Sequence, residues 1–347
     1  MKQISGSFRK VFGSKSKSGK SETVFKVEEM GTLKIPDVVP SPEQDSESLN
    51  KAFQGLGTDE EGIIWVLGHR NAEQRRKIRD TYQGLYSKPL IDALHSELSG
   101  DFRKAVILWT SDPAKRDARL ANEALKTKRK GIKQLQVIVE IACAFSSQHL
   151  VAVRQAYCSE FHCSLEEDIG DNVTLPLRKF LVGLVSSFRY DKEVVDMDVA
   201  KLEADRLHEA IKTRQLDDDD VVYILSTRNV CQLRTTFECY KQKYGNPIDQ
   251  DIKDCGKGDL ESLLKIVVWC IDSPEKHFAE VIGTSIIGLG TDEDSLTRAI
   301  VMRAEIDMMK VRGEYFNMYK SNLDDAVVGD TSGDYREFLM TLLGARV

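Results

Sequence analysis

The sequence has 347 residues, of which 41% are hydrophobic and 30% charged, and its 49 basic and 55 acidic side chains give a formal net charge of −6. This length suits about two domains or several repeated units, and no apolar stretch reaches the ~18 residues of a membrane-spanning helix. Seven cysteines without a CxxC pair argue against both a disulfide framework and a zinc module. We therefore expect a soluble intracellular protein.

The first segment, residues 1–23, is predicted to be a basic tail, either disordered or amphipathic. Residues 1–21 hold six Lys or Arg and no acid, so the remaining chain carries 43 basic and 55 acidic side chains, a net charge of −12. Ile4, Phe8, Val11 and Phe12 fall on one face of a helix, with basic residues beside it as in a short interfacial helix. An unstructured leader without a role is the other interpretation.

The charge of the body excludes some partners. A surface of net −12 should attract neither nucleic acid nor an anionic bilayer through its own field. We therefore expect no nucleic-acid partner. If the protein meets a membrane, a bound divalent cation or the basic tail must reverse the sign locally.

After an extended strap at residues 24–42, an internal repeat organises the chain. Four copies of an Arg-x-x-aromatic pattern recur at spacings of 75, 80 and 78 residues, at Arg79/Tyr82, Arg154/Tyr157, Arg234/Phe237 and Arg312/Tyr315. A shared period of this length indicates a repeat architecture. The predicted units are 43–113, 114–190, 197–274 and 275–347.

Each unit is predicted to be helical. In 61–68 and 133–142 the apolar residues recur at intervals of three and four. Thr58-Asp59-Glu60 and Thr291-Asp292-Glu293 place a capping residue and acids before an apolar run, which is typical of a helix N-terminus. Each unit has room for four or five short helices and no obvious strand, so the predicted fold class is all-α.

Two nearly identical segments open units one and four: FQGLGTDE from Phe53 and IIGLGTDE from Ile286. Paired glycines allow a tight turn that aims several carbonyl oxygens at one point, and such a point suits a hard cation such as calcium, which takes about 6–8 oxygen ligands. A carboxylate from elsewhere should complete the site. An acid in a turn-rich segment follows the second glycine by forty residues in both units, at Glu97 and Asp330.

GLGTDE, the distal acid and four repeats of about 75 residues resemble the annexin family over residues 24–347. Segments such as AFQGLGTDE, HRNAEQRRKIRDTY and GDTSGDY are most similar to plant annexins. The resemblance implies four five-helix repeats in a curved disc and Ca2+-dependent, reversible binding to acidic phospholipid membranes from the cytoplasm. It also allows actin or a second copy of the chain as a partner.

The resemblance implies these calcium ligands residue by residue. Those of the first site are the carbonyls of Phe53, Gly55 and Gly57 with the side chain of Glu97. Those of the second are the carbonyls of Ile286, Gly288 and Gly290 with Asp330. A weaker accessory site is implied at Thr58 with Glu60 and at Thr291 with Glu293.

The middle units depart from this pattern. Unit two has Lys128-Arg129-Lys130-Gly131-Ile132-Lys133 in place of the loop, although Asp171 remains at the place of the distal acid. Unit three has Cys255 at that place, and its Asp217–Asp220 run is interpreted as capping and first-turn charge. We therefore predict two principal sites. Lipid contacts are expected at the loop tips Leu56 and Leu289, and either lipid contact or a solvated helix end at Lys128, Arg129 and Lys130.

The remaining chemistry-bearing residues give weaker signals. Cys143 and Cys270 lie in apolar helical runs and are interpreted as buried thiols, although the resemblance links these positions to redox chemistry. His69 matches a position that the family has linked to haem and peroxidase activity, but no second ligand accompanies it. Trp65, Trp109 and Trp269 are expected to pack between helices.

Two other functions remain as alternatives to calcium-dependent membrane binding. The first is a calcium-regulated ion-conducting or transport protein, which would need a large rearrangement because nothing spans a bilayer. The second is a peroxidase or nucleotide-hydrolysing enzyme, for which no Ser/His/Asp or Cys/His arrangement is legible. We expect a protein that is not an enzyme.

Overall fold

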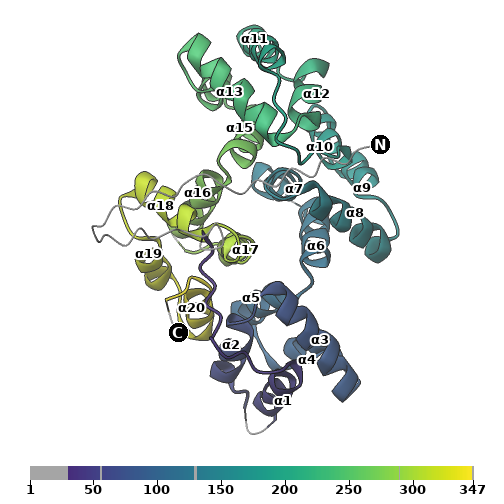
Figure 1. Ribbon diagram of the computed structural model, residues 1–347, viewed down its shortest axis with the longest axis vertical. Coiled ribbons are helices and arrows are strands. Elements are labelled where there is room, and N and C mark those ends of the chain that lie inside the picture. The colour runs from purple at the N-terminus through teal and green to yellow at the C-terminus, as the bar shows by residue number, and fades with distance from the viewer. Residues whose placement is uncertain (1–29, 55–56, 129–130, 289, 346–347) are drawn as a thin grey trace, which may run out of the picture.

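The computed structural model describes residues 30–54, 57–128, 131–288 and 290–345 (Figure 1). These residues form twenty α-helices and no strand, which confirms the predicted all-α class. The helices fall into four groups of five, called repeats 1 to 4 below.

The helices are short and follow one another closely. Repeat 1 contains α1 (Pro42–Ala52), α2 (Glu60–Gly68), α3 (Ala72–Tyr86), α4 (Leu90–Glu97) and α5 (Gly100–Thr110). Repeat 2 contains α6 (Pro113–Lys126), α7 (Ile132–Cys143), α8 (Ser147–Phe161), α9 (Leu165–Asn172) and α10 (Leu177–Ser186). Repeat 3 contains α11 (Met197–Thr213), α12 (Asp219–Thr227), α13 (Val230–Tyr244), α14 (Ile248–Cys255) and α15 (Asp259–Asp272). Repeat 4 contains α16 (Pro274–Ile286), α17 (Glu293–Arg303), α18 (Met308–Tyr319), α19 (Leu323–Asp330) and α20 (Gly333–Leu342).

Local sequence explains many of the helix starts. Ser41 with Gln44 and Asn71 with Gln74 form capping boxes at α1 and α3, in which each side chain binds the other residue's backbone N–H. The recurring Arg-x-x-aromatic pattern places its aromatic ring on the third helix of each repeat, and all four rings are buried (Tyr82, Tyr157, Phe237 and Tyr315). The period seen in the sequence is therefore a period of packed helices.

The four repeats lie side by side when the molecule is viewed down its shortest axis, and repeat 4 adjoins repeat 1 (Figure 1). Helix α5 contacts both α17 and α20 across this boundary. The strap reinforces it, because the Thr32 N–H donates to the Ala304 carbonyl at 2.8 Å and the Thr32 hydroxyl donates to the Leu342 carbonyl at 2.7 Å. The first and last repeats are thus joined, which brings their loops to neighbouring positions.

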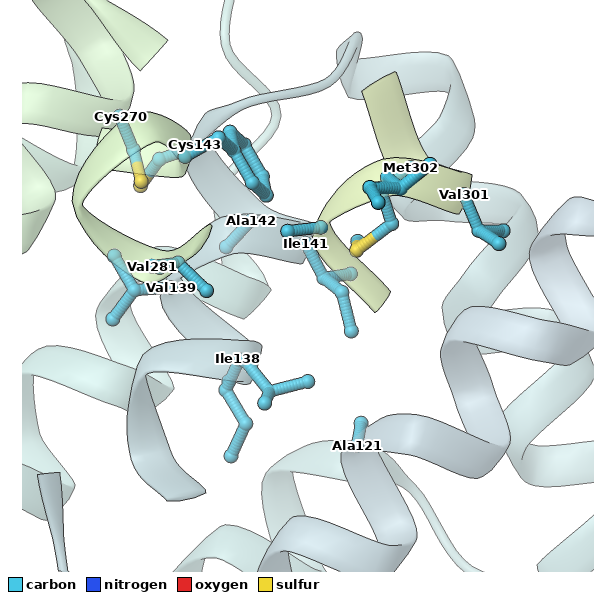
Figure 2. Packing of buried hydrophobic residues seen from close by; sticks show 14 of the residues in the cluster. Ala121, Ile138, Val139, Ile141, Ala142, Cys143, Cys270, Val281, Val301 and Met302 are labelled. Carbon is cyan, nitrogen blue, oxygen red and sulfur yellow. The ribbon is translucent and has the colours of Figure 1, made fainter. Parts of the chain in front are cut away.

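Helix α7 lies at the centre of the packing between repeats 2, 3 and 4. Its apolar side chains pack toward residues of α15, α16 and α17 (Figure 2). Glu140 of the same helix is fully buried and binds Arg298 of α17 at 3.0 Å and His277 of α16 at 2.9 Å. Buried polar groups therefore link repeats 2 and 4 within a largely apolar interface.

Candidate metal centres in repeats 1 and 4

The loop of repeat 1 connects α1 to α2 and is closed by its own backbone. The Asp59 N–H donates to the Ala52 carbonyl at 2.9 Å, and the Asp59 carboxylate caps α2 by accepting from the Gly62 N–H at 2.9 Å. Gly57 has φ +104°, a conformation that L side chains rarely adopt. The neighbouring Gly55 and Leu56 lie outside the described residues.

The loop of repeat 4, between α16 and α17, has the same construction. The Asp292 N–H donates to the Ser285 carbonyl at 2.8 Å, and the Asp292 carboxylate accepts from the Ser295 N–H at 3.4 Å. Gly288 and Gly290 have φ of +146° and +89°, while Leu289 lies outside the described residues. The near-identical sequences thus have matching backbone hydrogen bonds.

In both repeats the distal acid lies beside the loop. The Thr58 hydroxyl donates to the Glu97 carbonyl at 3.3 Å, and the Thr291 hydroxyl donates to the Asp330 carbonyl at 3.1 Å. Glu97 and Asp330 are the last residues of α4 and α19, both are exposed, and no ion pair engages either carboxylate among the described residues. Each carboxylate is therefore free to bind a cation from solvent.

The predicted carbonyl ligands that the structure describes are also free. No hydrogen bond reaches the carbonyl oxygens of Phe53, Gly57, Ile286, Gly288 or Gly290 from the described part of the chain. Phe53 follows the last residue of α1, and Ile286 is the last residue of α16. The final carbonyls of a helix lack intrahelical donors and carry its partial negative charge. Each loop thus sets a helix C-terminus and a carboxylate close together, an arrangement that favours a cation.

The side chains next to these carbonyls are anchored elsewhere. The Phe53 ring meets the Tyr82 ring edge-on with centroids 6.1 Å apart, and the Ile286 side chain is buried. The predicted accessory residues Thr58 and Thr291 use their hydroxyls to bind the distal segment. Glu60 and Glu293 occupy the first turns of α2 and α17, and neither carboxylate forms an ion pair within the described ranges.

A cavity of about 280 Å³ lies between repeats 1 and 4, next to the repeat 4 loop. Its acidic lining residues are Asp101, Glu293, Asp330 and Asp334. The predicted acids Glu293 and Asp330 of repeat 4 therefore share one cavity with Asp101 of repeat 1.

Repeat 2 has cations where repeats 1 and 4 have their loops. Lys128 is exposed, Lys126 pairs with Asp168 at 2.6 Å, and Arg129 and Lys130 lie outside the described residues. Asp171 is exposed on α9. The cations of this segment disfavour a calcium ion in repeat 2.

Repeat 3 closes its loop without glycine. Arg214 takes the left-handed conformation with φ +58°, and the Cys255 thiol donates to the Ile211 carbonyl at 3.5 Å. Burial raises the pKa of the Cys255 thiol, which keeps it neutral and a poor ligand for calcium. Asp218 caps α12 and Asp219 occupies its first turn, as predicted.

The other predicted residues occupy structural positions, with one exception. Cys143 and Cys270 are buried, and burial raises the pKa of both thiols. His69 is 3% exposed, and its Nδ1 lies 3.0 Å from the Trp65 carbonyl. A haem iron needs an accessible nitrogen, so this position does not favour a haem site.

The prediction that Trp65 packs between helices was wrong. Its side chain is 49% exposed and lies over the His69 ring at 4.5 Å between centroids. The adjacent apolar positions Ile63, Ile64 and Val66 are the ones that enter the core. The helical period puts Trp65 on the opposite side, and the size of its ring does not override that position.

Sequence reasoning also missed two ion pairs that end at the repeat 4 loop. Lys133 of repeat 2 binds Asp292 at 2.6 Å, and Lys104 of repeat 1 binds Asp294 at 3.0 Å. Neither pair has a signal in the sequence, because its members belong to different repeats.

No helix in the described ranges combines the length and the apolarity that crossing a membrane requires.

Comparison with known proteins gives a consistent result. The sequence model of the annexin family matches residues 44–109, 116–184, 202–267 and 277–342. Annexin D3 of Arabidopsis thaliana is 59% identical over 92% of this chain and 100% of its own length. Among solved structures, annexin III superimposes with a TM-score of 0.84 at 33% identity, covering 90% of this chain and 97% of the other. A calcium-bound annexin (Sm)1 superimposes with a TM-score of 0.79 at 28% identity, covering 90% and 93%.

Proposed function

This chain belongs to the annexin family, and we propose that it binds acidic phospholipid membranes through calcium ions held by the loops of repeats 1 and 4. The family is known for calcium-dependent phospholipid binding. One observation carries the proposal: the Thr58 and Thr291 hydroxyls hold each glycine loop against the backbone of Glu97 or Asp330. Neither of these two carboxylates forms an ion pair among the described residues.

Counting the ligands gives the mechanism. Three loop carbonyls and one bidentate carboxylate supply five oxygens, fewer than the usual 6–8 for calcium. Water or a lipid phosphate oxygen fills the remaining positions. Protein alone then holds calcium weakly, and an acidic membrane strengthens the binding. By linkage, calcium raises the affinity for lipid by the same factor.

The bridging calcium ion also overcomes the electrostatic repulsion between the acidic protein and an acidic bilayer. The chain outside residues 1–21 carries a net charge of −12, which repels an acidic bilayer. A divalent ion in each loop places positive charge at the contact itself. The proposed additional lipid contacts are Leu56 and Leu289, which the sequence predicts at the loop tips, and Lys128, Arg129 and Lys130 of repeat 2.

The proposed organisation follows from these assignments. The basic tail is residues 1–23 and the strap is 24–42. The repeats span 43–113, 114–190, 197–274 and 275–347, and only the first and last hold calcium. Thr58 with Glu60 and Thr291 with Glu293 remain the proposed weaker sites. The protein acts as a calcium-regulated binding protein and not as an enzyme, located in the cytoplasm and reversibly on membranes.

Co-sedimentation with phosphatidylserine vesicles across a calcium series tests this function. Pelleting of the wild type should depend on calcium and should be lost in a Glu97→Gln/Asp330→Asn double variant, because each change replaces a charged bidentate ligand with a neutral one. The matched control is Asp171→Asn, the same kind of change at the distal acid of repeat 2, which should bind like the wild type. Calcium-dependent pelleting by the double variant would contradict the proposal.

A further inference from the structure

The two proposed calcium loops differ in the charges that surround them. In repeat 1 the Asp59 carboxylate caps α2, and no ion pair engages it in the described part of the chain. In repeat 4 the corresponding Asp292 also caps its helix, but the Lys133 ammonium of repeat 2 lies 2.6 Å from its Oδ2 atom. Among the described residues, a charge from another repeat thus reaches the second loop at this position and not the first.

Both oxygen atoms of the Asp292 carboxylate are engaged. One accepts from the Ser295 N–H at 3.4 Å, and the other lies 2.6 Å from the Lys133 ammonium in an ion pair. The pair therefore consists of a carboxylate and an ammonium ion, and its net charge is zero. Asp292 stands two residues after Gly290, whose carbonyl is one of the proposed ligands.

We propose that Lys133 is an electrostatic brake on calcium binding in repeat 4, because it neutralises the Asp292 carboxylate beside the loop. This inference rests on the proposed calcium function. Without the lysine, an uncompensated negative charge would attract the divalent ion. The calcium affinity of repeat 4 is then set by a contact with repeat 2, and repeat 1 lacks such control.

The brake must be separated from a role of Lys133 in holding the loop. The loop keeps three other contacts: the bond from the Asp292 N–H to Ser285, the cap on α17 and the bond from Thr291 to Asp330. The Lys133 side chain is 61% exposed, and exposed ion pairs contribute little to stability. Electrostatic attraction should therefore decide whether loss of Lys133 raises or lowers the calcium affinity, and removing the lysine should tighten calcium binding.

Coulomb's law sets the size of the effect. A unit charge about 8 Å from a divalent ion in water, reduced by salt screening, changes the affinity by about two- to fivefold. Lys104, which binds both Asp294 and Asp101, adds a second charge of the same sign. Because Asp294 is 76% exposed, the Lys104–Asp294 pair should change the calcium affinity less than the Lys133–Asp292 pair does.

The experiment measures calcium binding by calorimetry in two single-site backgrounds of the full chain. Glu97→Gln leaves only the repeat 4 site and Asp330→Asn leaves only the repeat 1 site. Lys133→Gln should tighten calcium binding about two- to fivefold in the first background and leave the second unchanged. The gain should shrink as salt is raised, which loss of a purely structural contact would not produce.

Three matched variants sharpen the test. Lys115→Gln removes the same charge from repeat 2 at an exposed residue that has no ion pair among the described residues, and should have little effect on calcium binding. Lys133→Arg should behave like the wild type. Asp292→Asn, which keeps a good capping side chain, should weaken calcium binding and cancel the gain from Lys133→Gln when the two are combined.

Several results would overturn the brake. Weaker or unchanged calcium binding by Lys133→Gln in the Glu97→Gln background would do so, as would an equal gain in both backgrounds or the same gain from Lys115→Gln. Failure of the proposed function looks different, because neither single-site background would then bind calcium at all.

Discussion

Single glycines decide whether the two loops can form. Gly57 and Gly290 have φ of +104° and +89°, and a Cβ atom at either position would meet nothing within 4 Å. Space is therefore available for a side chain, and only the backbone conformation excludes it. This separates strain from crowding, two effects that glycine substitutions usually combine.

Gly57→Ala should raise the calcium concentration needed for vesicle binding and lower the free energy of unfolding by about 1–3 kcal/mol, the usual cost of holding an L residue in a sparsely populated conformation. Vesicle co-sedimentation and urea denaturation measure the two effects. Gly84→Ala is the control, because Gly84 lies exposed within α3 and a Cβ atom there would also meet nothing within 4 Å. It should stabilise the helix by up to about 1 kcal/mol. Equal behaviour of the two variants would refute the role given to the Gly57 conformation.

At the scale of helices, the buried carboxylate of Glu140 joins α7 to α16 and α17. It binds Arg298 and His277, which are themselves almost fully buried. A buried pair of this kind contributes little net stability when intact, but removing one partner leaves an isolated charge and costs about 3–5 kcal/mol. The network therefore fixes how repeats 2 and 4 dock.

Glu140→Gln should lower the free energy of unfolding by about 3–5 kcal/mol, because the Arg298 guanidinium loses the negative charge that balances it. Urea denaturation at neutral pH measures the loss. The control is Glu73→Gln, which removes an exposed partner of Arg76 within one helix and should change stability little. A small effect of Glu140→Gln would mean that water or another group reaches the Arg298 guanidinium.

The same carboxylate makes stability depend on pH. Burial alone would raise the pKa of Glu140, but Arg298 and His277 outweigh it and lower the pKa below its ordinary 4.5. The folded protein then binds fewer protons than the unfolded chain near and below that pH. This contribution to stability is complete above about pH 4.5 and is lost as the pH falls toward the lowered value. Urea midpoints between pH 6 and pH 3.5 should fall less steeply in Glu140→Gln than in the wild type; identical slopes would contradict this assignment.

At the scale of the whole molecule, the two proposed calcium loops belong to the first and last repeats, which pack against each other. Helix α5 contacts α17 and α20. Thr32 of the strap binds two carbonyls of repeat 4, those of Ala304 and Leu342. Two weak sites on one rigid body can bind the same bilayer, so their joint affinity exceeds that of either site. Loss of either distal acid alone should therefore weaken membrane binding strongly without abolishing it.

Removal of residues 1–21 tests how the molecule divides the task between its tail and its disc. The deletion takes away six basic residues and leaves a body of net charge −12. Binding to phosphatidylserine vesicles in calcium should persist, because the loops of repeats 1 and 4 remain. Any binding without calcium should be lost, since the remaining surface repels an acidic bilayer. Loss of the calcium-dependent binding would instead make the tail the principal anchor.

Much of this protein follows from its sequence alone. The 75-residue period is visible directly in the recurring motifs. The short helices and the glycine turns of both loops depend on interactions within a few residues, so composition and spacing reveal them. The recurring forty-residue offset even indicated which acids accompany the loops, because two copies of one pattern provide an internal comparison. Only the tertiary structure decided that the Thr58 and Thr291 hydroxyls bind the segments of Glu97 and Asp330, that Trp65 faces solvent, and that Lys133 reaches Asp292. Those contacts depend on how helices and repeats dock, and docking is set by the summed packing of many side chains that no local pattern records.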